Sequence, residues 1–319
     1  MLILLAVAMG GCIDINALLG ARQGKLFYAY DVLTPPHREV TLSARLQKST
    51  LGKIKEIPVG FYDSGGRLLG VAKTDSHGRA NFPWQGGPVG DYRFTARVMD
   101  SPRAARKHVD ELNPAPLLVA ARDPNSPIVI IDLDHTIVAG GAWDAMKDYP
   151  PPAMPGAREV TRRITKDYVI VYLTYRPDVL TDKSRRWLDC QGFPSGPLVA
   201  STMHALLEND SEEFKSQALA NIRKDFPNLR IGIGDRASDA QAYVDSGMVA
   251  YLIPHYKEDP AKMRDMAEDI RKLDNRGKMQ AVRDWKQIER GIFDHEIFTP
   301  QAYADWLTGQ AEEMEKRAK

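Results

Sequence analysis

The sequence has little cysteine, almost no net charge and no long apolar run beyond its first residues. With only Cys12 and Cys190 among 319 residues, a disulfide framework is excluded, and Cys190 is expected to be a small buried hydrophobe. The formal net charge of +1 gives no overall attraction to nucleic acid, so no nucleic-acid partner is expected. A hydrophobic content of 43% and a charged content of 27% are typical of folded globular proteins, and the length suffices for two domains.

The N-terminus, residues 1–23, carries an export-like pattern. Residues 1–9 are almost entirely apolar, and Gly10, Gly11 and Cys12 follow. This order resembles a bacterial lipoprotein signal cleaved before Cys12, which would then be lipidated. The resemblance implies an exported protein with a lipid anchor on the periplasmic side of a bacterial membrane. No Lys or Arg precedes the apolar stretch, so an ordinary secretory peptide, a membrane stub, a buried segment and a cytoplasmic location stay open.

Residues 24–100 alternate apolar and polar side chains in short runs between glycine-rich turns, which is typical of a small all-β sandwich. The glycines at 65–66 supply the positive φ angles that a hairpin turn needs. The string from Gly66 to Phe94 resembles transthyretin-like or immunoglobulin-like modules of exported proteins. It holds no catalytic constellation, so the partner of this domain stays open. Strands are expected at 40–46, 59–63, 68–72, 79–84 and 90–98.

Residues 101–125 are basic and rich in proline, and we expect an exposed linker there. From residue 126 onward strands alternate with helices, which predicts a parallel sheet. The expected fold class is α/β: a Rossmann-like parallel-sheet domain at 126–255 without a large cap, preceded by the sandwich. Residues 256–319 are expected to form C-terminal helices that complete or flank this domain. Its strands are expected at 128–131, 169–174, 229–235 and 250–254, with a helix beginning at residue 182.

The segment that follows the first of these strands carries the main chemical signal. Residues 128–131 are all β-branched, which predicts a strand buried on both faces. Asp132, Asp134 and Thr136 follow at alternating positions, at the strand end where open α/β sheets bind ligands. One carboxylate can attack phosphorus, and the second can protonate the leaving oxygen. Two carboxylates so close together need a divalent cation to offset their repulsion.

Four segments in this order resemble the haloacid dehalogenase superfamily of phosphohydrolases, over about residues 126–254. They are Asp132-Leu133-Asp134-His135-Thr136, Thr174 at a strand end, Lys215 on a polar helix, and Gly234-Asp235-Arg236-Ala237-Ser238-Asp239. The resemblance implies that Asp132 is the nucleophile and a metal ligand, and that Asp134 is the acid/base with its backbone carbonyl on the metal.

The resemblance assigns the remaining roles as well. Thr174 and Lys215 bind the phosphoryl group, Asp235 completes a Mg²⁺ site, and Asp239 is a further acidic partner. Lys183 is a rival for the role of Lys215, but it lies too soon after Thr174 for the usual order.

The flanking residues resemble one branch of the superfamily, the lipin-type phosphatidate phosphatases. The resemblance rests on Tyr172-Leu173-Thr174-Tyr175-Arg176-Pro177, on Glu213-Phe214-Lys215 and on 234–243, while 192–198 resembles the related actin-patch phosphatidate phosphatases. Two residues depart from the lipin pattern: His135 replaces a glycine, and Asp235 replaces an asparagine. The resemblance implies a Mg²⁺-dependent phosphomonoester hydrolase that acts through an aspartyl-phosphate on phosphatidate or a related phospholipid.

Two other readings stay open. The same chemistry would serve a soluble phosphomonoester, such as a sugar phosphate or a nucleotide end. In the second alternative the chain is a non-catalytic lipid-binding or scaffold protein, which the intact Asp132 and Asp134 argue against. For association with a membrane surface, the linker offers Arg103, Arg106 and Lys107 to anionic headgroups, although plain solubility also explains them.

Overall fold

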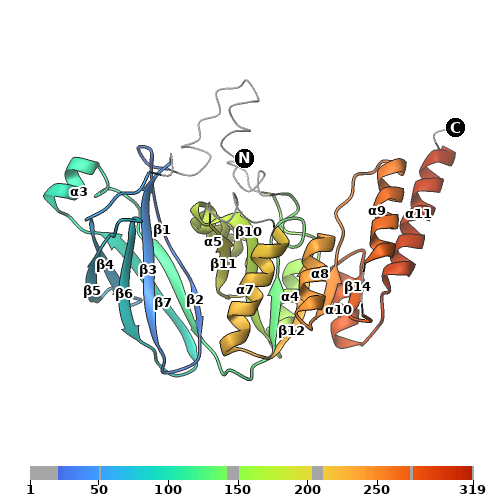
Figure 1. Ribbon diagram of the computed structural model, residues 1–319, viewed down its shortest axis with the longest axis horizontal. Helices are drawn as coiled ribbons and strands as arrows, with labels where there is room; N and C mark the ends of the chain where they lie inside the picture. The colour runs from blue at the N-terminus through green and yellow to red at the C-terminus, as the bar shows by residue number, and fades with distance from the viewer. Residues whose placement is uncertain (1–20, 50–51, 142–150, 203–210, 274–275, 318–319) are drawn as a thin grey trace.

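The computed structural model describes residues 21–49, 52–141, 151–202, 211–273 and 276–317. Figure 1 shows a β-rich part at one end, a layered α/β part in the middle and two long helices at the other end. Cys12 and the export-like pattern lie outside the described residues, and no described helix is long and apolar enough to cross a membrane.

The N-terminal part is a sandwich of two sheets. The first has the order β1-β3-β6, and the second β2-β8-β7-β4-β5. Every pairing is antiparallel except that of β2 with β8. Leu42 and Ala44 from one sheet share a buried core with Phe61, Phe94 and Val119 from the other, so the sheets pack face to face. The bounds are β1 Lys25–Ala29, β2 Val32–Thr34, β3 Glu39–Lys48, β4 Pro58–Asp63, β5 Leu68–Lys73, β6 Arg79–Gln85, β7 Gly90–Val98 and β8 Ala115–Ala121.

The segment at 101–125 differs from the expected exposed linker, because it contains a helix and a strand. Helix α3, Pro102–Lys107, begins after Ser101, whose Oγ accepts a hydrogen bond from the Ala104 backbone N–H. Strand β8 pairs with both β7 and β2. Its residues are all apolar apart from backbone groups, and Leu117 and Val119 are buried in the sandwich core. The linker was predicted from the prolines of this segment, whereas the apolar run at 115–121 forms a strand.

The second part is built on a six-stranded sheet of order β11-β10-β9-β12-β13-β14, in which every pairing is parallel. The predicted α/β fold class is confirmed. The sixth strand, β14, comes from the C-terminal region, where only helices were expected. The strands are β9 Ile128–Ile131, β10 Val169–Pro177, β11 Leu198–Ser201, β12 Leu229–Gly234, β13 Val249–Leu252 and β14 Met279–Ala281.

Helices cover both faces of this sheet because β9 is apolar on both sides. Ile128 and Ile130 pack with α7, α8, α9 and α11, whereas Val129 and Ile131 pack with α4, α5 and α10. Cys190, the last residue of α5, is exposed, so its predicted burial was wrong. The helices are α4 Ala157–Ile164, α5 Thr181–Cys190, α7 Ser211–Asp225, α8 Ala237–Asp245, α9 Pro260–Lys272, α10 Trp285–Phe293 and α11 Pro300–Arg317, with a 3₁₀ turn, η2, at Asp178–Leu180.

A glycine in β12 sets how closely α8 approaches the sheet. A Cβ atom added to Gly232 would lie 2.1 Å from Cγ of Tyr243, whose fully buried ring packs directly on the strand backbone. The close approach also brings Asp239 of α8 against the end of β12, since a Cβ on Gly234 would lie 3.1 Å from Cβ of Asp239. The packing of α8 therefore positions a carboxylate at the sheet edge.

Gly232→Ala should destabilise the protein by about 1–3 kcal/mol, because the new methyl group overlaps a ring that has no space to move. Gly309→Ala on α11 is the matched control. No atom lies within 4 Å of its added Cβ, so it should be neutral or stabilising by up to about 1 kcal/mol. Urea unfolding of the three proteins checks this, and equal midpoints for Gly232→Ala and wild type would refute the packing argument.

Candidate active site

Two adjacent strands deliver carboxylates to one edge of the sheet. Asp132 directly follows β9, and its backbone N–H donates to the Ile233 carbonyl oxygen at 2.9 Å. Asp235 directly follows β12, which pairs with β9. The carboxyl ends of parallel strands meet at the same edge, so both acids lie where α/β sheets bind ligands.

Asp132, Asp235 and Asp239 form an acidic cluster. One oxygen from each carboxylate lies within 4.8 Å of the others. Asp132 and Asp239 are buried, and Asp235 is half-buried. Carboxylate oxygens in this arrangement are the donor set that Mg²⁺ and similar hard cations prefer. The cluster therefore fits a divalent cation, and it includes Asp239, which the sequence marked only as a further acidic partner.

Lys215 of α7 lies inside this cluster. Its side chain is 1% exposed, and Nζ lies 2.6 Å from Oδ2 of Asp239 and 3.3 Å from Oδ2 of Asp132. Lys183, the rival candidate, lies on α5 and takes part in neither of these ion pairs. The lysine beside the predicted nucleophile is Lys215.

Burial and crowding shift the pKa values of these groups. Burial raises the pKa of Asp132 to about 7, although the charge of Lys215 opposes the rise. Burial, followed by the negative charge of Asp132, raises the pKa of Asp235 to about 8. For Lys215, burial disfavours the ammonium form, but Asp132 and Asp239 outweigh it and raise its pKa. When all three carboxyl groups are ionised, the cluster thus has more negative charge than one lysine can balance.

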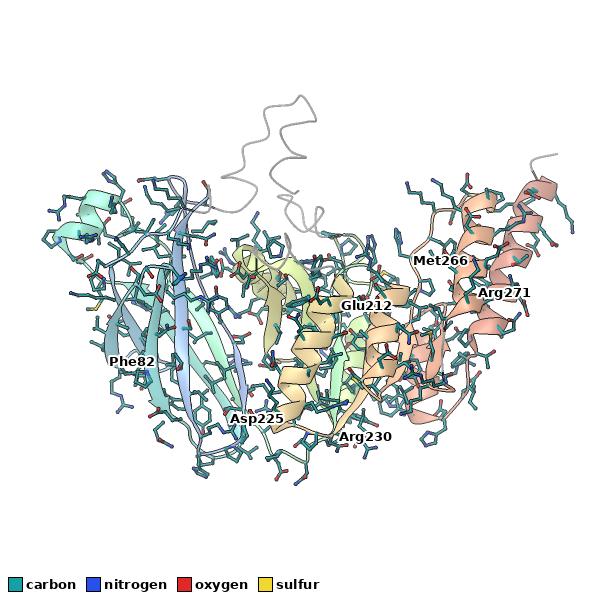
Figure 2. The ribbon with its side chains drawn as sticks, in the orientation of Figure 1. Phe82, Glu212, Asp225, Arg230, Met266 and Arg271 are labelled. Atoms are coloured by element: carbon teal, nitrogen blue, oxygen red, sulfur yellow. The ribbon has the colours of Figure 1, made fainter. Side chains whose placement is uncertain are left out.

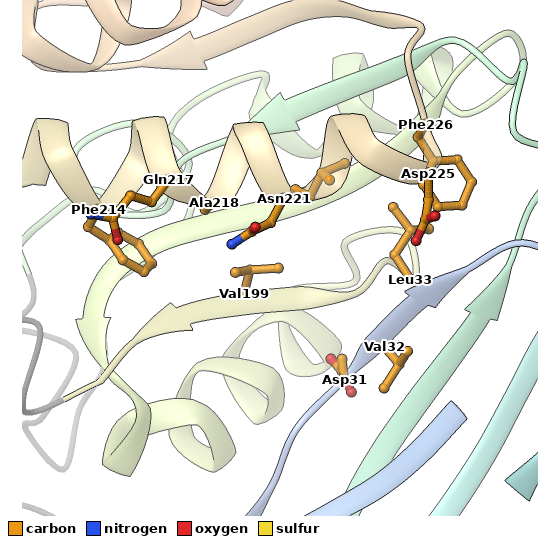
Figure 3. A pocket seen from close by; sticks show the side chains of 11 residues that line it. Asp31, Val32, Leu33, Val199, Phe214, Gln217, Ala218, Asn221, Asp225 and Phe226 are labelled. Carbon is orange, nitrogen blue, oxygen red and sulfur yellow. The ribbon is translucent and has the colours of Figure 1, made fainter. Parts of the chain in front are cut away.

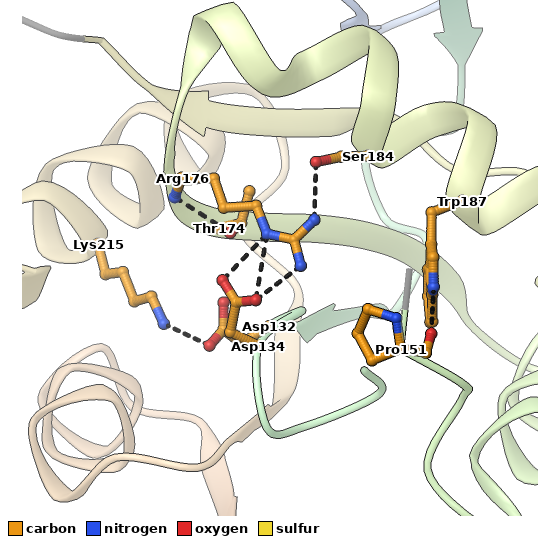
Figure 4. Close-up of polar contacts among 8 residues, drawn as sticks. All are labelled: Asp132, Asp134, Pro151, Thr174, Arg176, Ser184, Trp187 and Lys215. Carbon is orange, nitrogen blue, oxygen red and sulfur yellow. Dashed lines mark hydrogen bonds and ion pairs between the residues drawn. The ribbon is translucent and has the colours of Figure 1, made fainter. Parts of the chain in front are cut away.

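The second acid of the pair, Asp134, is held by a different partner. Arg176 donates to Oδ1 of Asp134 from Nη2 at 2.6 Å and to Oδ2 from Nε at 3.0 Å, as Figure 4 shows. Its Nη1 donates to Oγ of Ser184 at 2.9 Å, and the guanidinium is almost fully buried. Two-point contact of this kind fixes a carboxylate in direction as well as position. Sequence analysis included Arg176 in the lipin-like string but assigned it no role, because its partner Asp134 lies 42 residues earlier in the chain.

Thr174 reaches the same edge on β10. Tyr172 of β10 pairs with Ile131 of β9, so Thr174 lies beside the segment that carries Asp132. The threonine is 1% exposed, and its Oγ1 accepts a hydrogen bond from the Arg176 backbone N–H at 3.2 Å. A threonine hydroxyl at this edge can also donate a hydrogen bond.

His135 occupies a position at which the lipin pattern has a glycine. Its φ is 53°, in the left-handed region that favours glycine, where a non-glycine residue is uncommon. The imidazole ring stacks on His255 with centroids 3.9 Å apart and planes 9° from parallel. A histidine thus occupies a backbone conformation that favours glycine, and its ring packs on the loop after β13.

A groove of about 410 Å³ lies beside α7, between that helix, β11 and the sandwich (Figure 3). Val199, Phe214 and Ile222 are among its apolar lining residues, and Asp31 and Asp225 are among its polar ones. None of the predicted catalytic residues lines it.

Comparison with known proteins supports the superfamily. The model of the LNS2 domain of PITM 1-3 matches residues 129–253, a range that includes Asp132, Asp134, Thr174, Arg176, Lys215, Asp235 and Asp239. This match supports a haloacid dehalogenase-type phosphatase domain over that segment. A search of the curated proteins finds no match.

Solved structures give weak likenesses. A HAD-like phosphatase from Mesorhizobium loti is 16% identical, with 58% of this chain and 88% of that chain covered, at a TM-score of 0.39. The CARDB domain of a Pyrococcus furiosus protein is 18% identical, with 31% and 87% covered, at 0.23. A conjugative transposon lipoprotein from Bacteroides eggerthii is 8% identical, with 32% and 100% covered, at 0.20. Likenesses at these TM-scores do not bear on function.

Without a metal, the protein should lose stability as the pH rises. Asp132 and Asp235 have folded-state pKa values of about 7 and 8, against 3.8 ordinarily, so their protonated forms favour folding. This contribution is complete below the ordinary value and is lost as the pH passes through 7 to 8. Mg²⁺ should therefore raise the melting temperature more at pH 8.5 than at pH 6.

Thermal melts with EDTA or Mg²⁺ between pH 5 and 9 measure this effect. Asp235→Asn should shrink the Mg²⁺ stabilisation. Asp245→Asn, which removes an exposed carboxylate at the end of α8, should leave it unchanged. A Mg²⁺ effect that is equal at both pH values would contradict the assignment of the cluster.

Proposed function

We propose that this protein is a Mg²⁺-dependent phosphomonoester hydrolase that acts through an aspartyl-phosphate, with phosphatidate or a related phospholipid as substrate. The observation that carries the proposal is that two acids only two residues apart in the sequence have different partners. Asp132 lies buried beside Lys215 in the acidic cluster, whereas Asp134 is held by Arg176. This difference supports nucleophilic attack by Asp132 and proton transfer by Asp134.

In the first half-reaction the Asp132 carboxylate attacks phosphorus. The new Asp132–phosphorus bond forms while the bond to the leaving oxygen breaks, and protonated Asp134 gives its proton to that oxygen. Arg176 then stabilises the Asp134 carboxylate that remains, through the two-point contact. Lys215 and the Thr174 hydroxyl neutralise and orient the phosphoryl oxygens.

In the second half-reaction Asp134 removes a proton from water, which attacks phosphorus. The bond to Asp132 breaks, and inorganic phosphate leaves with both carboxyl groups restored. A divalent cation held by Asp132, Asp235 and Asp239 would supply the positive charge that offsets the cluster and the phosphoryl group.

Three observations support a lipid substrate. The LNS2 match covers the site, and the Tyr172–Arg176 string resembles lipin-type enzymes. Arg103, Arg106 and Lys107 are exposed on α3, at one end of the sandwich (Figure 1). An exported chain anchored at Cys12 would hold this basic end and the site beside an anionic lipid surface, where each nearby cation contributes roughly 1 kcal/mol.

Phosphate release from phosphatidate vesicles should depend on Mg²⁺ and be abolished in Asp132→Asn, because the variant has no nucleophile. Glu212→Gln, an exposed change on the same helix as Lys215, is the control and should retain activity. The assay is run in parallel with soluble phosphomonoesters. Turnover of soluble esters alone would keep the chemistry and overturn the lipid substrate, and no turnover by folded wild type would favour a binding or scaffold role.

Asp134→Asn should lower turnover by about 10²–10⁴-fold, because the leaving oxygen loses its proton donor and water loses its base. The slower second step should leave phosphate attached to the enzyme. Acid-quenched ³²P labelling measures this intermediate, with Asp132→Asn as the unlabelled control. Unimpaired turnover in Asp134→Asn would exclude the acid/base role.

A further inference from the structure

The sandwich contacts the segment that carries Arg176. Tyr30 Oη donates to Oδ2 of Asp178 at 2.8 Å, and Arg45 Nη1 donates to the same oxygen at 3.2 Å. Asp178 is the first residue of η2, directly after β10. Tyr30 follows β1, and Arg45 lies on β3. The sandwich therefore supplies both of these contacts to a carboxylate in the catalytic part, and we call Tyr30, Arg45 and Asp178 the junction cluster.

The junction cluster is buried. The Asp178 side chain is 1% exposed, and that of Arg45 is 17% exposed. Burial, followed by the charge of Asp178, raises the pKa of Tyr30 to about 12, so its hydroxyl stays protonated and donates. Apolar contacts surround the cluster, since Val179 and Leu180 of η2 pack with Leu26 and Tyr28 of β1.

Stability alone is a weak reason for this arrangement. The desolvation of a buried ion pair often offsets its attraction, and apolar residues of similar size would frequently serve as well. What a buried, directional pair does provide is a fixed position. Here the fixed residue is only two positions after Arg176, and the intervening Pro177 has its φ locked at −64° by the proline ring.

A short path thus joins the sandwich to the acid/base. Arg45 and Tyr30 bind Asp178 and so fix its position. Because Pro177 restricts the backbone between them, Arg176 is fixed as well, and Arg176 contacts Asp134. The other end of the turn is tied down too, because Ser184 of α5 accepts from Arg176. The next residue, Arg185, pairs at 2.8 Å with Asp31 of the sandwich, whose side chain is 1% exposed. Both sides of the Arg176 turn are therefore held by the sandwich.

We infer that the N-terminal sandwich is a positioning element of the catalytic site: Arg45 and Tyr30, through Asp178, hold the β10–α5 turn so that Arg176 keeps Asp134 aligned for proton transfer. This inference rests on the proposed function and gives the sandwich a role within it. Misplacing a catalytic group by about 1 Å costs up to roughly 10²-fold in rate. Loss of the junction cluster should act on the proton-transfer step and leave phosphoryl binding by Thr174 and Lys215 nearly intact.

The variants are Arg45→Met, Tyr30→Phe and the double variant Arg45→Met with Asp178→Asn. The double variant leaves no unpaired buried charge, so it keeps the experiment interpretable if the single variant unfolds. Arg45→Lys is the conservative rescue. The matched control is Arg38→Met, because Arg38 also pairs across the junction, at 2.5 Å with Asp225, but far from the Arg176 turn. In Figure 2 Asp225 and Glu212 mark opposite ends of α7. Lys215 follows Glu212 by three residues on that helix, so it belongs to the end opposite Asp225.

The readout compares two leaving groups. Phosphatidate in vesicles has a poor alkoxide leaving group that needs the Asp134 proton, whereas p-nitrophenyl phosphate has a good one that hardly does. Arg45→Met and the double variant should lower kcat for phosphatidate by about 10–100-fold and kcat for p-nitrophenyl phosphate by less than about 3-fold. Arg45→Lys should recover most of the loss, and Arg38→Met should show none.

Amide hydrogen exchange gives a readout that needs no activity. Exchange over residues 178–186 should become faster in Arg45→Met and stay unchanged in Arg38→Met. Equal losses on both substrates, or unchanged kcat, would overturn the positioning role. If wild type hydrolyses neither ester, the proposed phosphatase function fails on its own, and the exchange result then decides whether the sandwich holds the turn: unchanged exchange would overturn that as well.

Discussion

The structure of the site depends on an excess of negative charge at the ends of β9 and β12. Three carboxylates, those of Asp132, Asp235 and Asp239, share one small volume with a single ammonium group from Lys215. Burial of such charge is costly unless it is compensated, which is why two of the carboxylates have raised pKa values. The same imbalance makes the site receptive to a divalent cation. Gly232 and Gly234 let α8 approach β12 closely, which brings Asp239 into this cluster.

The two acids of the Asp132–Thr136 segment differ because the protein gives them different partners. Asp132 lies at the end of an extended strand and is directed to Lys215, whereas Asp134 is directed to Arg176. The left-handed residue that follows, His135, turns the chain away immediately afterwards. Two aspartates in one short segment therefore have different environments.

Sequence reasoning predicted the parts that depend on local pattern. The β-branched run at 128–131 and the acids behind it required a buried parallel strand, and the sheet has it at its centre. The sandwich was predicted from the alternation of apolar and polar side chains and from the glycine-rich turns. Sequence reasoning missed β8, β11 and β14, because their short apolar runs lie next to proline-rich or charged segments. Pairing with strands distant in the sequence determined their structure. Sequence reasoning also gave Arg176 no role, because a side-chain contact across 42 residues leaves no local signal.

The path of the chain makes the sandwich and the catalytic sheet one structural unit. Strand β8 is the last strand of the sandwich, and only six residues separate it from β9, the first strand of the parallel sheet. Asp31 joins them from the side: its carboxylate accepts from the Leu118 N–H of β8 at 2.6 Å and from the Leu198 N–H of β11 at 3.0 Å. One buried carboxylate thus satisfies backbone donors in both sheets, including one on the edge strand of the catalytic sheet, where an unpaired donor would otherwise be buried at the junction. A junction of this kind is a poor hinge for a mobile binding module and a good support for a site, because it fixes β11, the neighbour of the strand β10 that carries Thr174 and Arg176.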